Sequence, residues 1–136
     1  MMNVLETEWW SLALPPEWWA DTDEESILIA DRDEVGCIEI STLHKEQGDF
    51  DAEQVRRIAG EESAGTEDWR KVDLGDFRGF SGSFMEEGVA IREWYVSHGP
   101  LLLFITYSCD AENRGMDDAA VDELLDTLMV QQPSET

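Results

Sequence analysis

The sequence predicts an α+β fold, an α/β/α sandwich with a largely antiparallel twisted sheet and two main helices. Residues 101–108 are the most apolar run of the chain and carry no charge. They are apolar on both alternations, which is typical of a central strand buried on both faces. Two other segments show helical periodicity, and they follow blocks of strands rather than alternating with single strands. This order favours α+β over βαβ winding.

The N-terminal part begins with a mostly polar stretch over residues 1–8. Residues 9–14 are predicted to form a short strand, which ends at Pro15 and Pro16 because proline lacks the backbone donor. Residues 17–20 are expected to form a turn that folds their two indoles back onto the sheet.

Most of the remaining chain is expected to form hairpins. Two aliphatic runs at residues 26–30 and 35–43 are separated by a polar loop at residues 31–34, which indicates a hairpin. After the first helix, alternating patterns predict a meander over residues 69–77, 78–85 and 89–97 that leads into residues 101–108.

The first helix is predicted to start near Asp51. Asp51 and Gln54 have the spacing of a capping box, in which each side chain accepts a hydrogen bond from the other residue's backbone. Phe50 and Val55 occupy the positions of a hydrophobic staple. Gly65 is a suitable stop for this helix.

The second helix is predicted to begin at Asp117, a good N-cap residue, and to end before Pro133. Its expected buried face repeats every four residues, with further apolar residues beside it. The repeating residues are Met116, Ala120, Leu124 and Leu128.

The length of 136 residues predicts a single domain over residues 1–136, with its core at about residues 9–130. No secretory signal, lipidation motif or membrane-spanning run is visible, so we expect a cytoplasmic protein. Cys37 and Cys109 both fall in or at the end of predicted strands and are expected to be buried free thiols. They could pair only if their strands are neighbours.

The charge is strongly negative. The chain has 32 Asp and Glu against nine Lys and Arg, a formal net charge of −23. Such a surface repels nucleic acids and anionic membranes, and it attracts basic proteins. The alternative interpretation is an adaptation to solubility or high salt, which needs no partner.

No set of residues indicates catalysis or a cofactor. The acidic loops at 21–25 and 31–34 lie at opposite ends of one predicted strand, about 17 Å apart, so they cannot share a metal. Neither loop has the glycine and distant glutamate of an EF-hand. His98 and Cys109 are about 35 Å apart along an extended strand, too far for a catalytic pair. We therefore predict a non-enzymatic protein without catalytic residues, metal or cofactor.

Two pairs of adjacent tryptophans, at residues 9–10 and 18–19, stand out among the aromatic residues. Neighbouring residues on a strand point to opposite faces, so one indole of a pair is expected outside the main core. Tryptophan is often buried, but a partly exposed one beside an acidic loop suits a protein interface. The predicted partner-binding residues are Trp19, Asp21, Asp23, Glu24 and Glu25.

The segment Leu14-Pro15-Pro16-Glu17-Trp18 resembles the L-P-x-x-W entry of the Mog/PsbP-like fold family, which includes bacterial DcrB-type proteins. The order of the predicted elements over residues 9–130 is similar to that family too. The resemblance implies an α/β/α sandwich with an antiparallel sheet. It also implies a protein-binding role, since members bind a small GTPase, a photosystem or secreted effectors and are mostly not enzymes. No family-wide site residues carry over.

Three functions remain open on the sequence. The first is a non-enzymatic interaction module such as a chaperone, adaptor or immunity-type protein, which binds a protein partner and neither nucleic acid nor membrane. The second is an acidic inhibitor or nucleic-acid mimic that acts on a basic protein, marked by strong salt dependence. The third is a small-ligand or metal-binding protein, which needs a pocket with convergent polar groups.

Overall fold

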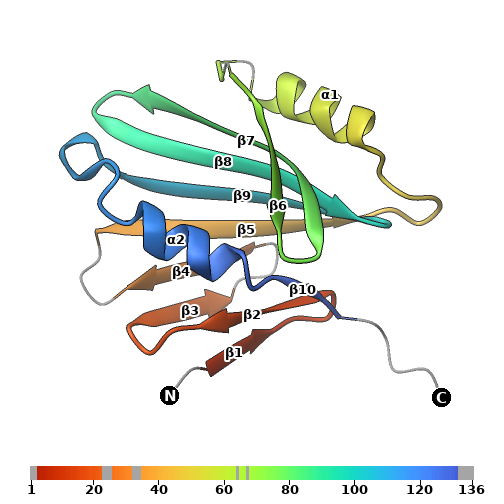
Figure 1. Cartoon of the computed structure of the whole chain (residues 1–136), viewed down its shortest axis with the longest axis horizontal. Coiled ribbons are helices and arrows are strands. Elements are labelled where there is room, and N and C mark those ends of the chain that lie inside the picture. Colours follow the sequence, from red (N-terminus) through yellow and green to blue (C-terminus); the bar gives the residue numbers. More distant parts are fainter. Residues whose placement is uncertain (1–2, 23–25, 32–34, 64, 67, 132–136) are drawn as a thin grey trace.

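The computed structural model describes residues 3–22, 26–31, 35–63, 65–66 and 68–131. Within these residues it has ten strands in two sheets and two α-helices, which confirms the predicted α+β sandwich (Figure 1). The elements are β1 (Asn3–Glu6), β2 (Trp10–Leu14), β3 (Trp18–Thr22), β4 (Ser26–Asp31), β5 (Gly36–His44), α1 (Ala52–Glu62), β6 (Arg70–Leu74), β7 (Phe77–Glu86), β8 (Val89–His98), β9 (Leu101–Asp110), a short 3₁₀ helix (Ala111–Asn113), α2 (Asp118–Leu125) and β10 (Met129–Val130).

The large sheet has seven strands in the order β3-β4-β5-β9-β8-β7-β6, all in antiparallel pairs. The predicted central strand is β9, the fourth of the seven. Leu101, Leu102 and Leu103 are all buried, as expected for a strand covered on both faces. Farther along β9, Thr106 and Ser108 on one face are only half-buried. Along β9, one face of the sheet is therefore covered throughout and the other is covered only in part.

Different elements cover the two faces of the large sheet. On one face, α2 and the small sheet β1-β2-β10 form the main core, which includes Trp10, Leu103 and Leu124. On the other face lies α1, where Val55 belongs to a second cluster together with Leu102. Burial of these apolar side chains is the main stabilising contribution to such a layered fold.

Helix α1 begins where the sequence predicts. The Asp51 carboxylate accepts the backbone N–H of Gln54 at 2.8 Å, and the Gln54 side chain accepts the backbone N–H of Asp51 at 3.1 Å. The predicted capping box is therefore confirmed. Phe50 and Val55 belong to one apolar cluster, in agreement with the predicted staple. The helix ends at Glu62, three residues before Gly65.

The prediction of a turn at residues 17–20 is wrong. The turn is tighter and closes through a hydrogen bond from the Trp18 N–H to the Pro15 carbonyl at 3.0 Å. The chain then forms β3, which pairs with β4 so that Trp18 lies opposite Asp31 and Trp19 opposite Ala30. Aromatic residues favour strands, and because adjacent residues of a strand alternate, Trp18 and Trp19 point to opposite faces of the sheet.

The polar start also contains an unpredicted strand. Residues Asn3–Glu6 form β1, whose side chains are mostly exposed. This strand pairs with β2, from Asn3 opposite Leu14 to Glu6 opposite Ser11. The pairing is made by backbone hydrogen bonds, so the polarity of the side chains does not predict it.

Helix α2 is shorter than predicted. It ends at Leu125, and Met129–Val130 instead form β10 against β2. The Asp117 side chain makes no capping bond but accepts the Tyr107 hydroxyl at 2.7 Å. Met116 and Ala120 are exposed, and the buried residues of the helix are Val121, Leu124 and Leu125.

Cys37 and Cys109 lie on the neighbouring strands β5 and β9, yet they do not pair. Cys109 is opposite Gly36 and Cys37 is opposite Ser108, so the two thiols point to opposite faces of the sheet. Both are free; Cys109 is buried as expected, whereas Cys37 is half-buried.

Candidate functional site

The α1 side of the large sheet is only partly covered. Helix α1 contacts β7 and β8, at the end of the sheet away from β3 and β4 (Figure 1). The uncovered part is called the open face below. It consists of the side chains of β3, β4 and β5 that point to this side, which are Trp19, Asp21, Ser26, Leu28, Ala30, Cys37, Glu39, Ser41 and Leu43.

Three large apolar side chains are exposed on the open face. Leu43 is 56% exposed, Trp19 45% and Leu28 36%. Trp19 pairs with Ala30, two residues from Leu28, so the indole lies diagonally beside Leu28. A sheet face of a layered fold normally buries such residues under another element. Their exposure marks a surface suited to a further partner.

The charge around the open face is of one sign. Strands β3, β4, β5 and β9 contain no Lys or Arg within their described residues, and they carry Asp21, Asp31, Glu39 and Asp110. Most of the described basic residues lie on α1 and on β6 to β8. The molecule thus has an acidic, partly apolar end and an end of mixed charge.

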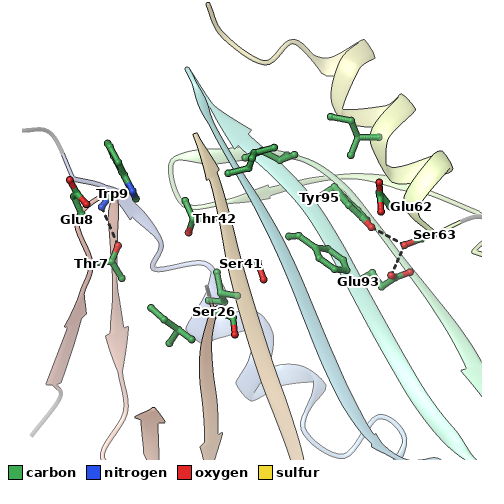
Figure 2. A pocket seen from close by; sticks show the side chains of 16 residues that line it. Thr7, Glu8, Trp9, Ser26, Ser41, Thr42, Glu62, Ser63, Glu93 and Tyr95 are labelled. Carbon is green, nitrogen blue, oxygen red and sulfur yellow. Dashed lines mark hydrogen bonds between the residues drawn. The ribbon is translucent and has the colours of Figure 1, made fainter. Parts of the chain in front are cut away.

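A cleft of about 820 Å³ adjoins the open face. It lies between the end of α1 and the turn from β1 to β2, and it crosses the ends of β4 and β5 (Figure 2). The described residues that line it are Thr7, Glu8, Trp9, Ser26, Ile27, Ile40, Ser41, Thr42, Leu43, Ile58, Glu62, Ser63, Glu93, Tyr95, Leu102 and Phe104.

A buried carboxylate lies at one end of this cleft. Glu93 of β8 is 5% exposed and accepts the Ser63 hydroxyl at 2.6 Å and the Thr66 hydroxyl at 2.7 Å. The Ser63 hydrogen is used in that bond, so the Tyr95 hydroxyl, 2.9 Å from Ser63 Oγ, donates to Ser63. Figure 2 shows this chain of hydroxyls converging on Glu93.

Gly82 allows the segment after α1 to approach Glu93. It lies opposite Glu93 on β7, and a Cβ at this position would come within 2.5 Å of Thr66 Cγ2 and 3.2 Å of the Trp69 ring. The absence of a side chain therefore lets Thr66 lie over the sheet beside the carboxylate.

The described lining of the cleft consists of hydroxyl groups, carboxylates, an indole and apolar side chains. Burial raises the pKa of Tyr95, and the negative charge of Glu93 raises it further against the opposing effect of the Ser63 hydrogen bond. The phenol is therefore a neutral donor at physiological pH. The described lining residues include no His, Cys, Lys or Arg. Across the described ranges no three His, Cys, Asp or Glu side chains are grouped as metal ligands.

The predicted partner-binding residues are only partly described. Trp19 and Asp21 are both exposed on β3, rather than in the expected turn and loop. Asp23, Glu24 and Glu25 lie outside the described residues, so their binding role stays a prediction. Sequence reasoning missed Leu28 and Leu43, whose runs read as ordinary strands, and Glu93, whose only signal is a charge within a mostly apolar strand.

The remaining expectations concern histidines and membrane segments. His44 stacks on Trp9 with 4.3 Å between ring centroids, and His98 bonds the Asp76 carbonyl at 2.9 Å. His98 pairs with Leu101 at the start of β9, and Cys109 lies near the other end of that strand. The two groups are therefore too far apart to act together, as predicted. No helix in the described part of the chain has the length and apolarity to cross a bilayer.

Comparison with known proteins gives the fold a counterpart. A protein from Bacteroides thetaiotaomicron VPI-5482, with a crystal structure at 1.50 Å resolution, matches with a TM-score of 0.67 and 20% identity over 93% of this chain. This chain spans about half of that protein, 47% of its length. The solution structure of cyanobacterial PsbP (CyanoP) from Synechocystis sp. PCC 6803 matches with a TM-score of 0.46 and 10% identity, covering 96% of this chain and 92% of that one. No protein-family model and no curated protein matches the chain.

The Bacteroides likeness, at this low identity, supports the fold alone. Membership of the Mog/PsbP-like fold family, and of its DcrB-type proteins, stays a prediction.

Proposed function

We propose that this protein is a non-enzymatic interaction module that binds a basic protein partner through the open face. The observation that carries this proposal is the uncovered half of the α1 side of the sheet, with Trp19, Leu28 and Leu43 exposed on strands that contain no described Lys or Arg. A chaperone, adaptor or immunity-type role fits such a surface.

The exposed residues suit the two parts of protein recognition. Tryptophan is enriched among residues that contribute most to binding, and Leu28 beside Trp19 enlarges the apolar area. Asp21 and Glu39 flank these side chains and would steer a basic partner toward them. Because charge mainly accelerates encounter while apolar contact holds the complex, the interface should survive moderate salt.

The two free thiols support a reducing compartment, so a cytoplasmic location forms part of the proposal. In the cleft the Ser63 hydroxyl donates to the Glu93 carboxylate, and the described lining residues include no His to act as the base of a Ser-His pair, which supports a role other than catalysis.

The test is affinity capture from lysate of the source cells, with bound proteins identified by mass spectrometry at low and high salt. The bait is the wild-type chain, and the variant bait is Trp19→Ser with Leu43→Ser. Met116→Ser is the matched control, because Met116 is 65% exposed but lies beside α2, away from the open face.

A partner retained at high salt by wild type and by Met116→Ser, but lost from the double variant, is the expected result. A partner lost from all three baits as salt rises would favour the acidic inhibitor or nucleic-acid mimic. Equal capture by the double variant would contradict the assignment of the open face.

A further inference from the structure

Glu93 is the only charged residue among the buried residues of the described chain. Its hydrogen-bond partners, Ser63 and Thr66, are both neutral, and no Lys, Arg or His of the described part forms an ion pair with it. Removing a carboxylate from water without a counter-charge is unfavourable, and hydroxyl donors offset only part of that loss. A carboxylate has about four acceptor positions, so this one can accept further donors.

The surface that leads away from Glu93 is apolar and aromatic. Tyr95 and Phe104 are stacked with their ring centroids 4.6 Å apart, and both line the cleft. Leu102 and Leu43 continue this wall on the same face of the sheet. Hydrocarbon can pack on this wall, and the aromatic rings add attraction for a cation that lies above them.

The electrostatics of the cleft select for positive charge. Glu8 lies at its β1–β2 end, and Glu62 and Glu93 lie at its α1 end (Figure 2). A concave surface lined by charges of one sign raises the local concentration of the opposite ion. Because the described residues contain no cluster of metal ligands, the geometry is better suited to an organic cation than to a metal ion.

We infer that the cleft binds an organic cation with an apolar body. The ammonium or guanidinium group lies against Glu93, and its hydrocarbon chain lies along Phe104, Leu102 and Leu43. The volume of about 820 Å³ is in the range of small-molecule sites. This inference goes beyond the proposed function, because it would hold even if the protein partner contacted only Trp19 and Leu28.

The same group can come from a free amine or from a Lys or Arg side chain of a partner. The probes are therefore n-hexylammonium, n-hexylguanidinium, and the capped tripeptides Gly-Lys-Gly and Gly-Arg-Gly. Neutral n-hexanol is the control for the hydrocarbon chain. Each probe is titrated into the purified full chain and followed by two-dimensional NMR.

The expected result is that a hexyl cation or a basic tripeptide shifts resonances of residues 93, 95, 102 and 104, and binds at least tenfold more tightly than hexanol. Stronger binding of the hexyl cations assigns the cleft to a free ligand, and stronger binding of the tripeptides assigns it to a partner side chain. Equal affinities for hexanol and hexylammonium, or shifts located elsewhere, would overturn the inference.

Two variants with the same change in charge locate the contact. Glu86 of β7 is exposed, pairs with Val89 and does not line the cleft. Glu93→Gln should weaken binding of the preferred cation at least tenfold, and Glu86→Gln should leave it within twofold. Equal binding by Glu93→Gln would overturn the inference.

Glu93→Gln could fail to fold, because the carboxylate holds the segment after α1. Phe104→Ala provides a second measurement, since it removes the aromatic wall and keeps the carboxylate. It should weaken binding of hexylammonium at least threefold in a chain that still unfolds cooperatively. Unchanged affinity in a folded Phe104→Ala variant would also count against the site.

Trp19→Ser separates this inference from the proposed function. Trp19 does not line the cleft, so this variant should bind the hexyl cations like wild type. Loss of protein capture with cation binding intact would show that the two surfaces act independently.

Discussion

The two halves of the α1 side of the sheet differ in what covers them. On β8, Tyr95 is buried under α1 in a cluster with Val55 and Ala59. Leu28 lies on β4, in the cross-strand row next to the one that contains Tyr95. No described helix covers Leu28, and its side chain is 36% exposed. This face of the sheet is therefore covered by α1 at one end and partly exposed at the other, with the cleft between the two parts. In the proposed function, a protein partner covers the exposed end.

The largest expected effect tests the centre of the sheet. Leu103→Asp places an unpaired charge at a position that is 0% exposed in the main core, so the chain should lose its cooperative fold. Leu43→Asp makes the same change on the open face. Leu43 is the residue of β5 next to Thr42, which pairs with Leu103. There the cost should be about 1 kcal/mol or less.

Circular dichroism and thermal unfolding distinguish these two outcomes. A soluble Leu103→Asp variant that still unfolds cooperatively would show that β9 is not the centre of the core. A Leu43→Asp variant that fails to fold would show that the open face is covered within the protein itself.

The alternating and periodic patterns predicted the central strand, the meander and the start of α1, because each depends on residues close in sequence. The half-covered face was not predictable in this way, since it depends on where α1 packs. The burial of Glu93 depends on Ser63 and Thr66, which are 30 and 27 residues away along the chain. The side-chain pattern of β8 alone cannot show that these hydroxyls converge.

β3 shows a different reason for failure. Two prolines and two adjacent indoles suggested a turn, but the turn needs fewer residues than expected and the indoles belong to a strand. Local composition marks the presence of a chain reversal more reliably than its length.

Alkaline titration separates the covered regions from the open half, because both tyrosines of the chain are in covered regions. Burial raises the pKa of Tyr95 and of Tyr107, and at Tyr107 the hydrogen bond to Asp117 raises it further. A raised pKa in the folded state means that stability is fully present below about pH 10, the unfolded value, and falls as pH rises above it.

We therefore expect no tyrosinate absorbance from the native protein below the pH at which it unfolds. Absorbance and circular dichroism should change together in one transition. A separate tyrosinate signal before unfolding would mean that one of the two covered regions opens locally.

The third expected effect concerns the border between the two halves. Gly82→Ala places a Cβ 2.5 Å from Thr66 and should displace the Thr66 hydroxyl from Glu93. Overpacking of this kind typically costs about 1–3 kcal/mol, measurable by urea unfolding. Gly65→Ala is the control, because its added Cβ would meet nothing within 4 Å. Equal midpoints for the two variants would mean that the approach at Gly82 is not tight.

The smallest expected effect tests the open face itself. Leu28→Ala removes apolar surface that is already partly in water, so the free energy of unfolding should change by about 0.5 kcal/mol or less. Leu102→Ala, at a buried position under α1, should cost about 2–5 kcal/mol. Urea unfolding of both variants measures this difference between the halves. If Leu28→Ala were as destabilising as Leu102→Ala, Leu28 would already be packed within the isolated chain, and the open face would not be available to a partner.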